Sequence, residues 1–72
     1  MDYKQRIRNL REDREMKQSE VAEILGIDQR TYSRYETGAN KMPIEYLKKL
    51  CILYKTSADY IIGLTNEPRR LK

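Results

Sequence analysis

The sequence predicts an all-α protein in which five helices form one compact domain. Apolar residues recur at intervals of three and four along the chain, as they do on one face of a helix. Capping and helix-ending residues separate these periodic stretches, and none of them has the strict alternation of a strand. A chain of 72 residues is close to the lower size limit for a stable single core, so the core must be small.

The first helix is predicted from about Tyr3 to Glu15. Asp2 precedes it, and its carboxylate can accept a hydrogen bond from a free amide of the first turn. Ile7 and Leu10 follow the helical period on the face that is expected to be buried.

Two short helices follow, over about Gln18–Leu25 and from Gln29 to about Thr37. Gly26 ends the earlier of them, because a left-handed backbone conformation is easiest for glycine. Asp28 caps the later one, where its carboxylate also matches the positive end of the helix dipole. A tight turn therefore joins the two helices.

The last two helices are predicted after the loop Gly38–Met42. Pro43 fits the first turn of the fourth helix, where its missing amide hydrogen costs no bond. Apolar residues continue at helical spacing to Tyr54. Ser57 caps a short fifth helix over Ala58–Ile62. The domain thus covers residues 1–64, and residues 65–72 form a polar, basic C-terminal tail.

The composition favours an anionic partner and gives no indication of a metal or cofactor. The formal net charge is +4, and such a basic balance attracts polyanions. The chain has no histidine and one cysteine, so neither a disulfide within the chain nor a zinc site can form. Cys51 is therefore expected to be a small core residue in a reducing cytoplasm.

Membrane proteins and enzymes are both disfavoured by the sequence. No apolar run is long enough to span a bilayer and no signal sequence precedes the first helix, so we expect a cytoplasmic protein without a membrane partner. The chain lacks histidine, paired carboxylates in an apolar setting and a glycine-rich phosphate loop. Catalysis is therefore not expected.

The third predicted helix separates polar from aromatic residues. At about 100° per residue, Gln29, Arg30 and Ser33 share one face. Tyr32 and Tyr35 lie on the opposite face. Glutamine can bind adenine and arginine can bind guanine, each through two hydrogen bonds in the major groove. With a short helix and a glycine turn before it, this is the layout of a DNA-reading helix-turn-helix, although polar residues can also simply solvate a helix.

Over about Ile7–Leu64 the chain resembles the lambda-repressor-like (Cro/XRE) helix-turn-helix family of five-helix DNA-binding domains. The resemblance rests on the segments IRNLRED, QSEVAEILGI, RTYSRYETG and LKKLCILYKTSADYIIGL, in this order and at this spacing. It implies a partner in double-stranded DNA.

The resemblance also implies roles for single residues. Gln18 matches the glutamine with which the family binds a backbone phosphate and braces the reading helix. Thr37 and Lys41 match its phosphate-binding loop, although a loop lysine can equally be solvated. Arg11 and Glu36 fall where the family often places an ion pair between the first helix and the end of the third.

Two positions depart from the family, and one more cation adjoins the polar face. Lys17 stands where Thr or Ser usually caps the second helix, a loss of about 0.5–2 kcal/mol that a phosphate contact would offset. Tyr32 stands where an aliphatic residue is commoner, so its hydroxyl must reach solvent, a backbone partner or the DNA. Arg34 lies at the edge of the polar face and is expected to contact a phosphate.

These observations predict a transcriptional regulator that binds a palindromic operator as a homodimer, because one such module contacts only a few base pairs. Tyr60, Ile62 and Leu64 are the predicted dimer surface, although Tyr60 can equally be core. Repression is favoured over activation, since a short chain can act by occupying a promoter. An antitoxin that binds a toxin protein and represses its own operon is the alternative.

Overall fold

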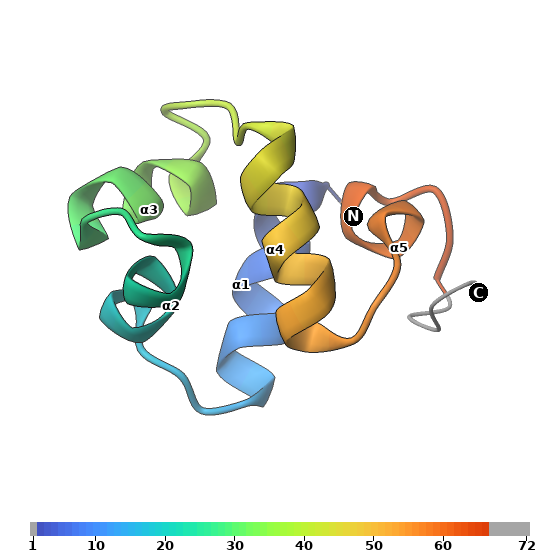
Figure 1. Cartoon of the computed structure of the whole chain (residues 1–72). Coiled ribbons are helices and arrows are strands. Elements are labelled where there is room, and N and C mark those ends of the chain that lie inside the picture. Colours follow the sequence, from blue (N-terminus) through green and yellow to red (C-terminus); the bar gives the residue numbers. More distant parts are fainter. Residues whose placement is uncertain (1, 67–72) are drawn as a thin grey trace.

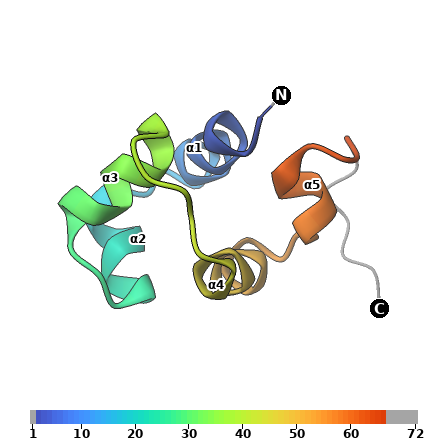
Figure 2. The same ribbon diagram turned by 90° about the horizontal axis from the view of Figure 1, so that it is seen from above.

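The computed structural model describes residues 2–66, and within this range all of the regular secondary structure is helical. The five helices are α1 (Tyr3–Asp13), α2 (Gln18–Leu25), α3 (Gln29–Thr37), α4 (Ile44–Tyr54) and α5 (Ala58–Ile62). This confirms the predicted all-α class. Figures 1 and 2 show α2 and α3 together at one end, α5 at the other, and α1 and α4 between them. Residues 67–72 of the predicted tail lie outside the described range.

Two predicted helix boundaries are wrong. Helix α1 ends at Asp13 rather than Glu15, because Glu15 takes a left-handed backbone conformation with φ of 53°. Pro43 precedes α4 as its N-cap, with an extended backbone at ψ of 147°. Its carbonyl accepts hydrogen bonds from the amides of Tyr46 and Leu47 at 3.1 and 3.2 Å. Pro43 is therefore the residue before the first turn of α4 and not, as predicted, a member of that turn.

Side chains cap four of the helices in two different ways. Asp2, Asp28 and Ser57 each accept a hydrogen bond from the amide three residues further on, at 3.0, 2.7 and 3.0 Å. Lys17 cannot cap α2 in this way. Instead, the carboxylate of Glu20 accepts the amide hydrogen of Lys17 at 2.7 Å. Half of a capping box remains at α2 and offsets part of the expected loss.

Every helix contributes to one buried core. The core residues are Ile7, Leu10, Val21, Ala22, Leu25, Tyr32, Tyr35, Leu50, Tyr54 and Ile61. The chain contains neither phenylalanine nor tryptophan, so every aromatic ring in this core carries a hydroxyl. Burial raises the pKa of Tyr54 to about 12, and this residue therefore stays neutral at physiological pH. A polar partner stabilises a buried hydroxyl. The Tyr32 hydroxyl has such a partner, whereas the buried Tyr54 hydroxyl has none among the described residues.

Arg6 was not predicted to be buried, yet it joins α1 to α5. The residue is 5% exposed, and its guanidinium carbon lies 4.0 Å from the centroid of the Tyr60 ring. One guanidinium nitrogen donates to the side chain of Asn66 at 3.5 Å. A cation over an aromatic face is stabilised by the ring quadrupole, and the stem of arginine packs as an apolar chain. This contact half-buries Tyr60.

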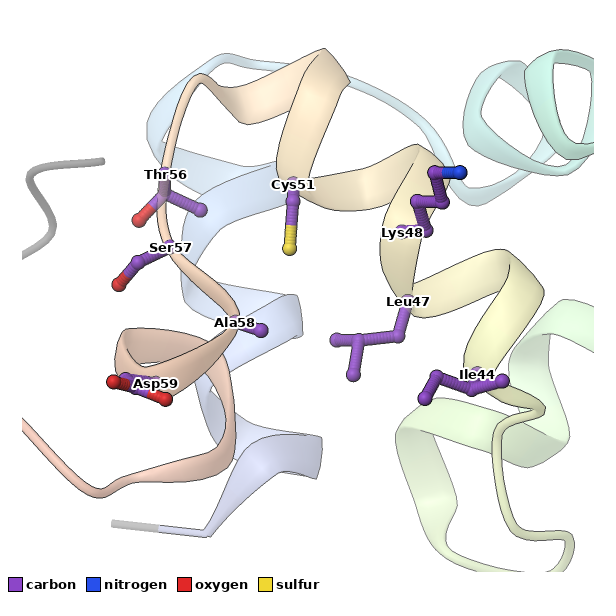
Figure 3. A pocket seen from close by; sticks show the side chains of 8 residues that line it. All are labelled: Ile44, Leu47, Lys48, Cys51, Thr56, Ser57, Ala58 and Asp59. Carbon is purple, nitrogen blue, oxygen red and sulfur yellow. The ribbon is translucent and has the colours of Figure 1, made fainter. Parts of the chain in front are cut away.

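Cys51 packs against the core without being fully buried. It lines a groove of about 500 Å³ between α4 and α5, together with Leu47 and Ala58. Figure 3 shows its sulfur directed into this groove. Cys51 is therefore only partly the core residue that was predicted: it packs against the core and also borders an open groove.

Candidate nucleic-acid interface

The turn between α2 and α3 fixes the two helices against each other. Gly26 takes a φ of 77°, and the next amide, that of Ile27, donates to the Ala22 carbonyl at 3.0 Å. Ala22 is 2% exposed, and its small side chain lets the helices approach closely. The Asp28 cap then begins α3 directly. The local sequence therefore produces the predicted pair of helices joined by a short turn (Figure 1).

Helix α3 has one polar, accessible face and one buried aromatic face. Gln29 and Arg30 are exposed and Ser33 is half-buried, and no hydrogen bond within residues 2–66 engages these three side chains. On the other side, Tyr32 and Tyr35 are 0% and 6% exposed. The predicted separation of the two faces is thus present. The polar side chains remain available to a partner.

The carboxylate of Glu36, in the last turn of α3, is bonded from three helices. Arg11 of α1 donates through Nε at 2.8 Å and through Nη2 at 3.1 Å, which makes a two-pronged salt bridge. Gln18 of α2 donates through Nε2 at 3.1 Å, and the Tyr32 hydroxyl donates at 2.5 Å. The Glu36 side chain is 3% exposed. One buried charge therefore ties α1, α2 and α3 together.

Charge and hydrogen bonding keep this buried carboxylate ionised. Burial alone would raise the pKa of Glu36, but the hydrogen bonds from Arg11, Tyr32 and Gln18 outweigh it, so the pKa lies below its ordinary value. The hydrogen bond to Glu36 raises the pKa of Arg11. Burial and the adjacent carboxylate also raise the pKa of Tyr32. The cluster is thus one anion, one cation and one neutral phenol at physiological pH.

The bond from Tyr32 to Glu36 was not predicted from the sequence. The sequence places the Tyr32 ring on the buried face and predicts solvent, a backbone group or DNA as the partner of its hydroxyl, whereas in the structure the hydroxyl donates to the Glu36 carboxylate. The signal was present in the spacing, because residues four apart on a helix are neighbours and Tyr32 precedes Glu36 by four positions.

The residues expected to contact phosphates lie in two groups. Lys17 is exposed and Gln18 is half-buried at the start of α2, where one amide hydrogen of Gln18 is already bonded to Glu36. Arg34, Thr37 and Lys41 are exposed along the end of α3 and the loop after it. The Thr37 hydroxyl donates to the Arg34 carbonyl at 3.3 Å and accepts from the Ala39 amide at 3.4 Å. Its hydrogen bonds thus shape the loop.

The residues expected at a dimer surface differ in exposure. Ile62 is 45% exposed and Leu64 is 75% exposed, whereas Tyr60 is half-buried under Arg6. Two apolar side chains at the end of α5 are thus accessible, and the third is largely occupied within the domain.

Comparison with known families gives the assignment that the geometry suggests. The model of the helix-turn-helix family matches residues 7–61, which is more than half of the chain. The chain belongs to this family. The match is to its Cro/C1 type, which confirms the resemblance. This is a family of transcriptional regulators and not of enzymes.

Two relatives of this helix-turn-helix protein are longer than it is. It is 41% identical over 66 residues to the uncharacterized HTH-type transcriptional regulator YobD of Bacillus subtilis (strain 168). It is 36% identical over 72 residues to the cryptic phage CTXphi transcriptional repressor RstR of Vibrio cholerae. The matches cover 92% and 97% of this chain but 59% and 65% of the two relatives. The helix-turn-helix chain thus spans less than two thirds of either.

Residues 2–66 contain neither a metal-binding cluster nor a membrane-spanning helix. No three His, Cys, Asp or Glu side chains in this range lie close enough together to hold a metal ion. Nor does the described part of the chain contain a helix with the length and apolar character needed to cross a membrane.

Proposed function

We propose that this protein is a sequence-specific regulator of transcription that represses by occupying a palindromic operator as a homodimer. The polar face of α3 carries this proposal. Gln29 and Arg30 are exposed without an internal hydrogen bond, at the end of the helix that enters the major groove in this motif. The two relatives support it, since one is named a transcriptional regulator and the other a transcriptional repressor.

The contacts divide into base reading and phosphate binding. Gln29 reads adenine and Arg30 reads guanine through paired hydrogen bonds, and Ser33 reaches a base edge one turn further along. The proposed phosphate contacts come from five residues: Lys17, Gln18, Arg34, Thr37 and Lys41. They orient the domain on the duplex without reading its sequence.

Contacts on two sides of α3 hold the proposed reading helix rigidly. Glu36 fixes the helix to α1 and α2 through its bonds to Arg11 and Gln18. Buried Tyr32 and Tyr35 hold the opposite face. Because the helix is fixed on these sides, the reading side chains are presented with little freedom in the backbone. Preorganisation of this kind lowers the entropy cost of binding.

Dimer formation is proposed through the end of α5. Ile62 and Leu64 are exposed apolar side chains there, and Tyr60 contributes the edge of its half-buried ring. A two-fold dimer places the two reading helices in successive major grooves, so the half-sites should be about 10–10.5 bp apart from centre to centre.

Selection of bound duplexes from a random library, at near-physiological salt, tests the proposed function. The expected result is a palindromic motif with half-sites one helical turn apart. Binding that depends on salt but yields no motif would contradict base reading. That outcome would favour a protein partner such as a toxin.

Replacement of single residues then tests the division of roles. Gln29→Ala should relax the preference at one base position in each half-site, at a cost of about 1–3 kcal/mol for the preferred base. Lys41→Ala should weaken binding to all sequences equally and reduce the salt dependence by about one unit for each subunit bound. Selections that give identical motifs with both variants would contradict the division.

A further inference from the structure

We propose that Lys4, in the first turn of α1, is an additional phosphate-binding residue that acts together with Lys41. This inference rests on the proposed DNA-binding function and extends the same surface to a helix outside the motif. Lys4 is far from α3 in the sequence, so the spacing of residues in the helix-turn-helix gives no indication that it binds a phosphate. Its position beside the end of α3 is what the structure supplies.

The side chain of Lys4 lies directly against Gly38. Gly38 ends α3 with a φ of 89°, and its amide donates to the Arg34 carbonyl at 3.0 Å. A Cβ added at Gly38 would lie 2.7 Å from Cδ and 3.1 Å from Nζ of Lys4. Real Cβ atoms essentially never approach closer than 3.0 Å. Glycine thus leaves the space that Lys4 occupies, and the ammonium lies where the loop after α3 begins.

Lys4 and Lys41 line the same concavity, which has a volume of about 400 Å³. The other described residues that line it are uncharged: Tyr3, Gly38, Met42, Leu47 and Ile62. Two cations from different segments therefore face one space whose described lining contains no carboxylate. Like charges held together in this way attract an anion.

One carboxylate near Lys4 competes with such an anion. Oδ2 of Asp2 lies 3.6 Å from the Lys4 ammonium. The two side chains are 59% and 38% exposed, so solvent screens this pair and it contributes little. Asp2 also caps α1 through its other oxygen. The ammonium therefore remains available to a phosphate. Its attraction to Asp2 weakens that contact somewhat, and removal of the Asp2 charge would show by how much.

The position of the concavity identifies the anion as a DNA phosphate. It adjoins the C-terminal end of the proposed reading helix and the loop that carries Lys41, so a duplex seated on α3 brings its backbone there. The flexible lysine stem delivers a point charge, which suits a phosphate oxygen. The alternative is purely structural, because an ammonium at the negative end of α3 also stabilises that helix.

Lys4→Met tests the proposal, because methionine keeps an unbranched apolar stem and loses the charge. Affinity for the selected operator is measured as a function of salt. The slope of log K against log salt is negative, and its magnitude should decrease by about 0.9 for each subunit bound. This corresponds to about eight-fold weaker binding per contact at 0.1 M salt. Lys4→Arg should keep the wild-type slope. Lys55→Met is the matched control, because exposed Lys55 lies at the other end of α4 from the loop.

Asp2→Asn should act in the opposite direction and tighten binding, since asparagine caps a helix as well as aspartate does. An unchanged slope in folded Lys4→Met, even with lower affinity, would assign Lys4 a structural role and overturn the proposal. Circular dichroism establishes that each variant is folded. Absence of DNA binding by the wild-type protein would instead refute the proposed function.

Discussion

Replacement of Tyr32 by phenylalanine isolates the hydrogen bond that departs from the family pattern. The hydroxyl donates to Glu36 at 2.5 Å, and the substitution removes that one atom without opening a large cavity. A hydrogen bond to a charged group contributes about 1.5–3 kcal/mol. For a chain of 72 residues, the whole free energy of unfolding is about 4–11 kcal/mol. One oxygen atom is therefore expected to account for a substantial part of the stability.

The loss is measured by urea denaturation and by thermal melting. For a domain of this size each kcal/mol shifts Tm by about 4–8 °C, so the loss of about 1.5–3 kcal/mol should lower Tm by about 6–24 °C. Tyr35→Phe is the matched control, because Tyr35 is buried on the same helix and its hydroxyl has no hydrogen-bond partner among the described residues. That variant should lose little stability.

The pH dependence of the loss identifies its cause. The folded-state pKa of Glu36 lies below the ordinary value of 4.5. A carboxyl with a lowered pKa contributes stability that is fully present above the ordinary value and is lost as the pH falls through the folded-state value. The difference between wild type and Tyr32→Phe should therefore be full near neutral pH and shrink below pH 4.5. A difference that stays constant with pH would refute the charge-assisted bond and assign the effect to packing.

Two other replacements test the cap of α5 and the proposed dimer surface. Ser57→Ala should destabilise the domain by about 1 kcal/mol through loss of the α5 cap, whereas Ser57→Asn should keep the cap and most of the stability in urea denaturation. Leu64→Ser should shift light-scattering mass from dimer to monomer without changing the helical content, because Leu64 is 75% exposed. An unchanged mass would remove the end of α5 from the proposed interface.

Much of the fold is predictable because its signals are local. Asp28 and Ser57 cap helices through an amide only three residues away, and Gly26 and Gly38 supply the left-handed conformations that end helices. The faces of α3 likewise follow from periodicity, since Tyr32 and Tyr35 need only be on the side opposite Gln29 and Arg30. Local chemistry of this kind determines the helix pattern before any tertiary contact is known.

The errors occur where a local preference loses to a distant contact or to an unfavourable conformation. Glu15 takes a left-handed conformation that a non-glycine residue rarely adopts, so α1 ends earlier than its composition indicates. Arg6 is buried because Tyr60, more than fifty positions away in sequence, offers its ring. Charged residues are mostly exposed, and a single sequence does not reveal such an exception.

The roles of single site residues depend still more on tertiary structure. Lys4 lies beside Gly38 only because α1 packs against the end of α3. The resemblance implies that Gln18 braces the reading helix, but the partner through which it does so, Glu36, is known only from the structure. Neither contact follows from helical spacing, because each joins residues that belong to different helices.

The bond from Gln18 to Glu36 is compatible with the proposed phosphate contact. A glutamine side chain has two amide hydrogens, and a carboxylate can only accept. Glu36 therefore fixes the nitrogen, rather than the oxygen, of the Gln18 amide toward α3. The second hydrogen on that nitrogen is left for a phosphate oxygen. Arg11 and Tyr32 keep the carboxylate ionised, so they position Gln18 indirectly. Tyr32→Phe should accordingly weaken DNA binding less than Gln18→Ala does, while it destabilises the fold more.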